Sequence, residues 1–227
     1  MTTHEGAAAP EEATPIPLFP LSTVVVPGST LPLRIFERRY REMVADLQAR
    51  RPSERIFGVV GIYKGHEVGV GRAEEIYDVG SLVRLDRVVP EGGMLAVSGT
   101  AVGRFAIVAV RRRHHSYTRA DVRPLPDVVV DADLVNERAD AVRSAYRTYA
   151  RMIGLAGTVD GLDPLQLPYT LIDRLPLTMA DAQRVLEAPT CDDQLDLLTQ
   201  ILRREIAIAG RFGAVSLRAN PGGAALN

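Results

Sequence analysis

Few residues in this sequence have types and spacing suited to catalysis, and Lys64 is the first to consider. The chain has 227 residues, and Lys64 is its only lysine. A Walker A loop needs Gly-Lys-Ser/Thr, but Lys64 is followed by Gly65 and His66. A serine–lysine dyad would also have to use Lys64, and nothing in the neighbouring sequence would shield its amine from water. The sequence therefore predicts neither a phosphate loop nor a lysine-activated serine.

Other motifs with possible chemistry are also incomplete. The segment Gly69–Glu74 reads GVGRAE, with glutamate where a dinucleotide fingerprint needs its third glycine. His114 and His115 are adjacent, so on a strand they would point to opposite faces and would not readily share one metal ion. Cys191 lies near a predicted helix start, and we interpret it as a quiet, partly buried thiol. We expect no catalytic residues, no cofactor and no metal site, and hence a protein that is not an enzyme.

Composition narrows the class of protein. Hydrophobic residues make up 46% and charged residues 24%, with a formal net charge of -1, so the phosphates of a nucleic acid are an unlikely main partner. One cysteine excludes an intramolecular disulfide and fits a reducing compartment. The first fifteen residues lack a secretory signal pattern, and no apolar run reaches the roughly 18 residues of a membrane span. We therefore expect a cytoplasmic protein without membrane contact.

The elements that must position any binding residues fall into two regions. In the first, β-branched runs such as Ser22–Gly28 and Arg55–Tyr63 alternate with Gly and Pro, and a helical period covers Ile35–Arg50. The turn Pro90–Gly93 joins two further strands as a hairpin. This pattern predicts a small antiparallel barrel with one helix.

The second region has helical spacing throughout. A long helix is predicted over Asp131–Leu155, with Leu134, Ala141, Ala145 and Tyr149 near one face. Pro164 suits a first helical turn, Pro168 should shorten or kink that helix, and Thr178 and Thr190 mark two further helix starts. The expected α+β organisation is a disordered tail over 1–15, a barrel over 16–125, a helical bundle over 126–211 and a flexible tail over 212–227.

One surface feature is unusually basic. The segment Arg111–Arg123 concentrates arginines around Tyr117. Such charges commonly protect an exposed strand edge. Alternatively, they form a patch for an acidic peptide or a nucleic acid, with Tyr117 available for stacking.

Three separated blocks of the sequence resemble the amino-terminal, substrate-binding domain of Lon proteases. These are "IPLFPLSTVVVPGSTLPLRIFERRYREMV", "IYDVGSLVRLDRVVPEGGMLAVSGTAVGRFAI" and "LPLTMADAQRVLEAPTCDDQLDLLTQILRREI", in the family's order and spanning about Pro15 to Arg211. Ser81 departs from the threonine that is usual there, and Gln194 from a frequent arginine. Lon proteases continue into an ATPase module and a serine–lysine peptidase, for which this chain has no counterpart, so it resembles a freestanding recognition domain.

The resemblance implies a PUA-like β pseudo-barrel followed by a helical bundle. It also implies a non-catalytic module that binds unfolded or partner polypeptide as an adaptor or sensor, with a protease in trans as a possible associate, and with a monomer or weak homodimer as the expected state. RNA binding through the basic patch is the alternative. The residues expected to contact polypeptide or RNA are Tyr63, Arg111, Arg112, Arg113 and Tyr117.

Overall fold

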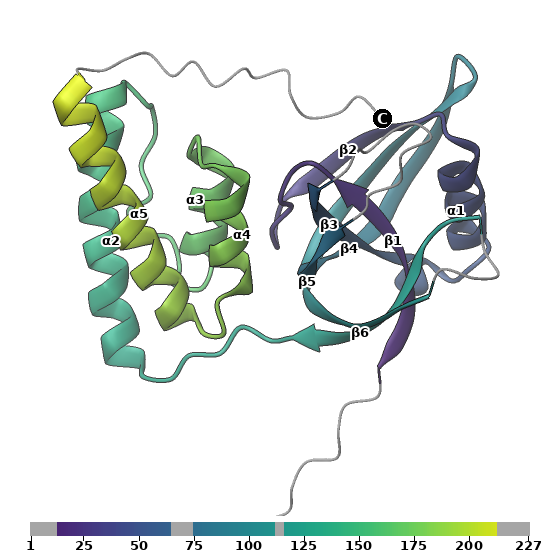
Figure 1. The fold of residues 1–227 in the computed structure, drawn as a ribbon, viewed down its shortest axis with the longest axis horizontal. Coiled ribbons are helices and arrows are strands. Elements are labelled where there is room, and N and C mark those ends of the chain that lie inside the picture. The colour runs from purple at the N-terminus through teal and green to yellow at the C-terminus, as the bar shows by residue number, and fades with distance from the viewer. Residues whose placement is uncertain (1–12, 65–74, 112–115, 213–227) are drawn as a thin grey trace, which may run out of the picture.

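The computed structural model describes residues 13–64, 75–111 and 116–212, and within them a β-barrel is joined to a helical bundle (Figure 1). The strands are β1 (Thr14–Leu21), β2 (Thr30–Ile35), β3 (Ile56–Lys64), β4 (Glu75–Glu91), β5 (Met94–Arg111) and β6 (Arg119–Leu125). The helices are α1 (Arg38–Gln48), the 3-10 turn η1 (Pro52–Glu54), α2 (Ala132–Ile153), α3 (Leu167–Arg174), α4 (Met179–Glu187) and α5 (Cys191–Phe212). The expected order of a barrel followed by a bundle is confirmed.

Strand pairing closes the barrel. The sheet order is β2-β5-β4-β3-β1-β6, and β6 also pairs with β5, so five strands form a ring that β2 extends. The hairpin predicted at Pro90–Gly93 is present, with positive φ angles at Gly92 and Gly93. The expectation of a purely antiparallel barrel is wrong, because β1 pairs parallel with β3. The connection between them contains β2 and α1, and a crossover of that length permits parallel pairing.

The barrel core is built from alternate strand residues and one face of α1. Phe19 and Phe57 pack with Tyr40 and Met43 of α1, whose charged residues face outward. The predicted strand over Ser22–Gly28 is absent: strand β1 ends at Leu21, and the three valines that follow form a loop. The loop lies between the two halves, because Val25 is buried in the barrel core and Val26 is fully buried in the core of the bundle.

The bundle core lies between the long helices α2 and α5 and the short helices α3 and α4. Thr178 caps α4 by accepting a hydrogen bond from the Asp181 amide, and the Thr190 hydroxyl accepts one from the Asp193 amide at the start of α5, as predicted. Helix α3 begins at Leu167, so Pro168, not Pro164, occupies its first turn. The residue spacing predicts an apolar stripe along α5, and its members Leu195, Leu198, Ile201 and Leu202 are buried while Ile206 is partly buried.

Candidate functional site

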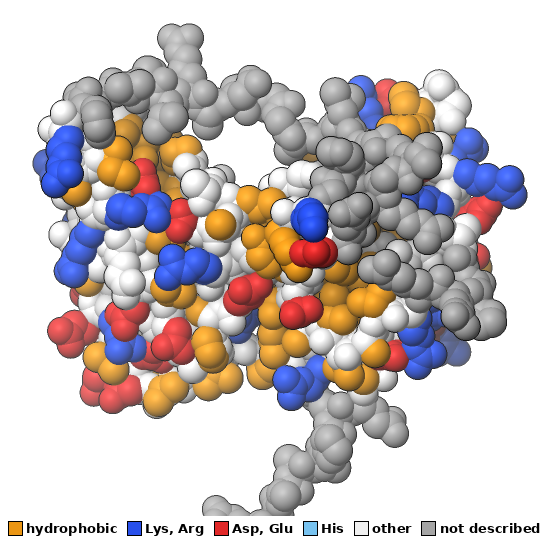
Figure 2. All heavy atoms as spheres, viewed as in Figure 1, with side chains coloured by type: hydrophobic (Ala, Val, Ile, Leu, Met, Phe, Trp, Pro, Cys, Tyr) orange, Lys and Arg blue, Asp and Glu red, His pale blue; other side chains and the backbone are white. Residues whose placement is uncertain are grey.

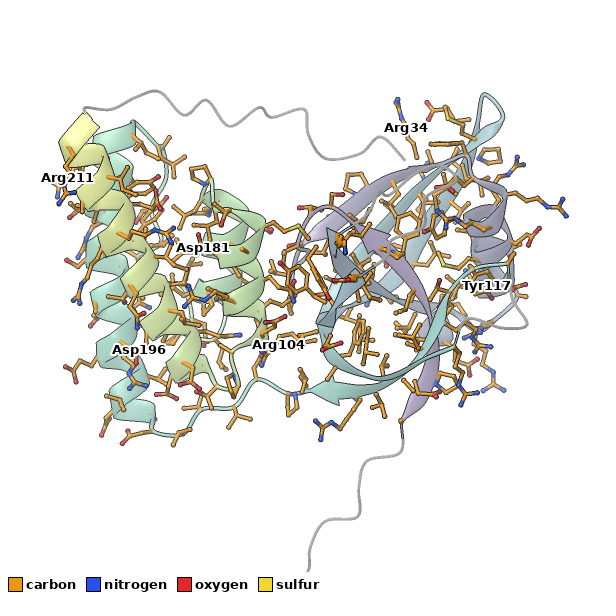
Figure 3. The ribbon with its side chains drawn as sticks, in the orientation of Figure 1. Arg34, Arg104, Tyr117, Asp181, Asp196 and Arg211 are labelled. Carbon is orange, nitrogen blue, oxygen red and sulfur yellow. The ribbon has the colours of Figure 1, made fainter. Side chains whose placement is uncertain are left out.

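The two halves of the molecule meet at a junction held by a buried arginine. Arg104 projects from β5 toward the bundle, and only 2% of it is exposed (Figure 3). Its Nη1 donates hydrogen bonds of 2.8 Å to the carbonyls of Leu186 and Ala188, at the end of α4. Its Nη2 donates to the Pro126 carbonyl at 3.2 Å, and its Nε lies 3.1 Å from Asp127 Oδ1. One barrel side chain thus holds the last carbonyls of a bundle helix and the linker between the two halves.

The side chains of Tyr169 and Gln194 extend this hydrogen-bond network into the bundle. The Tyr169 hydroxyl donates a hydrogen bond to Asp127 and accepts one of 3.3 Å from the Gln194 amide. Burial, supported by the bond to Asp127, raises the pKa of Tyr169 well above its usual value. Gln194, which departs from the usual Lon pattern, is therefore a buried partner of this network.

A cleft of about 520 Å³ opens beside this network. Its walls come from both halves of the molecule (Pro27, Gly28, Asp127, Leu165, Gln166, Tyr169, Thr170, Asp173 and Arg174). The Ser29 hydroxyl spans it by donating a 2.6 Å hydrogen bond to Asp173. Desolvation raises the pKa of Asp173, while this hydrogen bond acts in the opposite direction. The cleft between barrel and bundle thus has a polar wall.

A different surface lies where the end of β3 meets the start of α4. The Tyr63 and Tyr77 rings pack 5.1 Å apart at a 53° tilt, and 53% of Tyr63 is exposed. A Cβ placed on Gly61 would lie 2.6 Å from Met179 Cε and 2.9 Å from the Tyr77 ring, so both side chains close over this glycine. We call Tyr63, Tyr77 and Met179, gathered around Gly61, the junction patch. Figure 2 shows hydrophobic side chains gathered between bundle and barrel on the face it displays.

A polar rim borders the junction patch. Lys64 Nζ lies 3.5 Å from Glu75 Oε1, and both side chains are largely exposed. A hydrogen bond between the Tyr63 hydroxyl and Glu75 raises the pKa of Tyr63. An aromatic surface of this kind, with a thioether beside it, adapts to varied apolar side chains and offers hydroxyl groups for hydrogen bonding.

Among the described residues, Lys64 and Cys191, the two considered above for chemistry, are paired or buried. Lys64 pairs with Glu75, and Cys191 is 1% exposed, with burial raising its pKa to about 11. Within the described residues, no group of three or more His, Cys, Asp or Glu is arranged to hold a metal ion. None of the helices in the described ranges combines the length and apolar character needed to cross a membrane.

The residues expected from sequence to contact a partner do not form one surface. Tyr63 is exposed, and Arg111 at the end of β5 is exposed and pairs with Asp121 at 2.7 Å. Arg112 and Arg113 lie outside the described residues. The expected exposure of Tyr117 is wrong: it is 5% exposed, packs in the barrel core and donates a 2.6 Å hydrogen bond to Asp46 (Figure 3). The RNA alternative therefore loses its proposed stacking residue.

Sequence reasoning missed several residues of the junction. Tyr77, Arg104 and Met179 all lie within the blocks that resemble the Lon domain, but their types and spacing do not mark them as contact residues. Gly61 offered a usable signal, because a glycine inside an apolar strand often marks the close approach of another segment. From sequence, Ser81 is apparent only as a departure from the family's usual threonine. In the structure its buried hydroxyl donates a 2.6 Å hydrogen bond to the Val25 carbonyl and so fixes the loop of Val24, Val25 and Val26, the valine loop.

Solved structures place this fold. A Lon N-terminal domain protein from Xanthomonas campestris matches with a TM-score of 0.58 and 25% identity, covering 84% of this chain and 98% of that one. The N-terminal domain of a Mycobacterium avium complex Lon protease matches with a TM-score of 0.63 at 16% identity, over 84% and 98% of the two chains. The barrel joined to a helical bundle is therefore the architecture of Lon amino-terminal domains.

The family is also identified from sequence. The family described as "ATP-dependent protease La (LON) substrate-binding domain" matches residues 15–204, and the chain belongs to it. Lon protease 1 of Herpetosiphon aurantiacus is 25% identical over 212 residues, 88% of this chain and 25% of that protein. Lon protease 2 of Desulfotalea psychrophila is 27% identical over 203 residues, 85% and 25% of the two. The chain thus spans about a quarter of the length of these curated relatives.

Proposed function

We propose that this chain binds exposed apolar and aromatic segments of polypeptide without cleaving them, as an adaptor or sensor. The observation that carries the proposal is the match of residues 15–204 to a substrate-binding domain family of ATP-dependent proteases. A domain with this role must accept many sequences, so its contact surface should combine adaptable apolar groups with a polar rim.

The junction patch has these properties. Tyr63 offers an exposed ring, Tyr77 supports it from the neighbouring strand, and Met179 adds a flexible thioether from the bundle. Tyrosine gives large contact area at low cost in conformational entropy, which is why it is frequent at binding hot spots. Because the patch draws on both halves of the molecule, its shape depends on the junction beneath it.

The absence of cleavage is part of the proposal. Serine–lysine hydrolysis requires an amine that is shielded from water, whereas Lys64 is exposed and paired with Glu75. Thiol hydrolysis requires a reactive thiolate, whereas the Cys191 thiol is buried and its pKa is raised to about 11. As an adaptor, the protein would deliver the bound polypeptide to a separate protease.

The test is equilibrium binding to a permanently unfolded client. Fluorescein-labelled, reduced and carboxymethylated α-lactalbumin is titrated with the protein, and fluorescence anisotropy should saturate at tens of micromolar. Tyr63→Ala should weaken binding about fivefold or more, as expected for an exposed aromatic anchor. Phe36→Ala is the matched control, because Phe36 is an aromatic residue 44% exposed, and the preceding Ile35 pairs with Leu95 at the opposite end of β5 from the strand residues that face β4 near Tyr77.

Two results would refute the proposal. One is an anisotropy that does not saturate up to roughly 100 μM protein. The binding free energy would then be weaker than a few well-packed aromatic contacts provide. The other is the appearance of client fragments on a gel after incubation with the purified protein, with or without ATP. Equal weakening by the Tyr63 and Phe36 substitutions would place the contact surface elsewhere.

A further inference from the structure

The linker between barrel and bundle exposes an unusual run of apolar side chains. Between the end of β6 at Leu125 and the start of α2 at Ala132, Val128, Val129 and Val130 are 42%, 39% and 73% exposed. This segment forms no turn, helix or paired strand. Figure 1 shows it as an open stretch that crosses from the barrel to the first turn of α2. Three consecutive exposed valines are costly to leave in water and favour strand conformation.

The hydrogen bonds of this linker alternate along the chain. The Pro126 carbonyl accepts from Arg104 at 3.2 Å, the Val128 carbonyl accepts from the Cys191 amide at 2.9 Å, and the Val130 amide donates to Asp192 at 3.2 Å. In the described part of the chain, the backbone groups of Asp127 and Val129 take part in no hydrogen bond. A period of two is the pattern of an extended strand, in which alternate residues direct their backbone groups to opposite sides.

One side of the linker is therefore fixed to the protein, and the other resembles an unpaired strand edge. An antiparallel partner strand could form a pair of hydrogen bonds with Val129 and another with Asp127, while its side chains pack on the valines. Natural proteins commonly cover or blunt such edges. Nothing in the described residues covers this one.

The surface around the linker is acidic. Asp131 and Asp133 begin α2, Asp193 lies in the first turn of α5, and none of the three is within ion-pairing distance of a described Lys or Arg. Figure 2 shows acidic and hydrophobic side chains together at the lower end of the bundle, where Figure 1 places the linker. A basic partner is thus favoured over an acidic one, because its charge complements this surface.

We propose that the linker Pro126–Val130 is a strand-addition site for an extended, lysine- or arginine-bearing polypeptide segment. This rests on the proposed function, and it adds a second contact with its own selectivity. The junction patch takes apolar and aromatic side chains, whereas the linker takes the backbone of a basic segment. A polypeptide long enough to reach both would be held more tightly than either contact alone allows.

The test uses a labelled peptide of about seven residues that alternates lysine with valine and threonine, in keeping with the two-residue strand period. Val129→Pro removes the Val129 amide donor but keeps the Val128 carbonyl and an extended backbone, and it should weaken peptide binding about tenfold. Val129→Thr keeps the donor and the side-chain shape, so it should bind as wild type does. Asp131→Asn combined with Asp133→Asn retains the helix cap and should weaken binding a few-fold, with a shallower salt dependence.

A second measurement does not depend on any variant folding. The same peptide methylated at alternate amide nitrogens cannot complete the pairing, and it should bind wild-type protein about tenfold more weakly than the unmethylated peptide. The proposal is overturned if the methylated peptide, or a peptide with glutamate in place of lysine, binds equally well. It is also overturned if Val129→Pro changes only self-association, since the occupant would then be a second copy of this chain.

Failure of this inference can be separated from failure of the proposed function. Carboxymethylated α-lactalbumin is titrated in parallel with the Val129→Pro and Tyr63→Ala variants. If the client still binds and still depends on Tyr63 while the basic peptide ignores Val129→Pro, only the linker site is lost. If neither probe binds the wild-type protein, both proposals fall.

Discussion

The junction has two sides that use similar residue types for opposite purposes. On one side, Arg104, Asp127 and Tyr169 are joined to one another or to backbone carbonyls. On the other side, Tyr63 and Tyr77 pack against each other with Tyr63 half in solvent. The first side holds the two halves of the molecule together, and the second leaves adaptable surface for a partner.

Burial explains this difference. Buried polar groups must find partners within the protein, so the closed side has a defined geometry. An exposed aromatic ring has no such requirement, and its apolar area remains available for binding. The comparison teaches that residue type alone does not identify a binding residue in this chain. Whether the side chain is buried within the protein or exposed to a partner decides the matter.

Breaking the closed side should have the largest effect. Arg104→Ala leaves the Leu186 and Ala188 carbonyls without their buried donor and Asp127 without its ion-pair partner, and we expect it to lower the free energy of unfolding by about 3–5 kcal/mol. Arg104→Lys keeps the charge but offers fewer donors in a different geometry, so its loss should be intermediate. Urea unfolding followed by circular dichroism measures both. A loss below about 1 kcal/mol for Arg104→Ala would mean that the two halves do not depend on this contact.

The junction patch can be disturbed by a substitution at Gly61, the glycine that its side chains cover. Gly61→Ala places a Cβ 2.6 Å from Met179 Cε and 2.9 Å from the Tyr77 ring, so both must shift. Overpacking of this kind costs about 1–3 kcal/mol, and here it should also weaken client binding by distorting the junction patch. Gly103→Ala is the matched control on a barrel strand, because no atom lies within 4 Å of its added Cβ. If the two variants had equal stability and equal client affinity, the packing around Gly61 would have no influence on the junction patch.

Much of the fold could be predicted because its signals are local. The hairpin at Pro90–Gly93, the caps at Thr178 and Thr190 and the stripe of α5 each depend on residues close in sequence. The valine loop could not be predicted in the same way. Its β-branched residues favour a strand, but the Ser81 hydroxyl and the bundle core hold it in another conformation.

The orientation of α2 illustrates a second limit. Of the residues that the spacing places near one face, Tyr149 is buried and Leu134 is 37% exposed, and the buried face also includes Val135, Val142 and Tyr146. Two adjacent stripes of this helix are both apolar, and only its packing against α5 selects between them. The candidate site was harder still, because its residues come from β3, β4 and α4. Of the contact residues expected from sequence, Tyr63 lies in the junction patch.

Tyr117 and Tyr63 provide a smaller and sharper test of the comparison. Tyr117→Phe removes the hydrogen bond to Asp46 from a side chain in the barrel core, and it should lower the free energy of unfolding by about 1 kcal/mol. Tyr63→Phe removes a hydroxyl at an exposed site, so its effect should stay within about 0.5 kcal/mol. Thermal unfolding of both variants against wild type measures the difference. A larger loss of stability from Tyr63→Phe than from Tyr117→Phe would mean that Tyr63, and not Tyr117, is the tyrosine that stabilises the fold.

The buried Tyr117 should also make the stability of the protein modestly dependent on pH. Burial, with the hydrogen bond to Asp46, raises the pKa of Tyr117 to about 12, whereas an unfolded tyrosine ionises near pH 10. Below about pH 10 the contribution of Tyr117 to stability is fully present, and it is lost as pH rises toward 12 because only the unfolded chain releases the proton. The stability difference between wild type and Tyr117→Phe, measured by urea unfolding, should therefore be smaller at pH 11 than at pH 9. A difference that stays constant would show that folding does not raise the pKa of Tyr117.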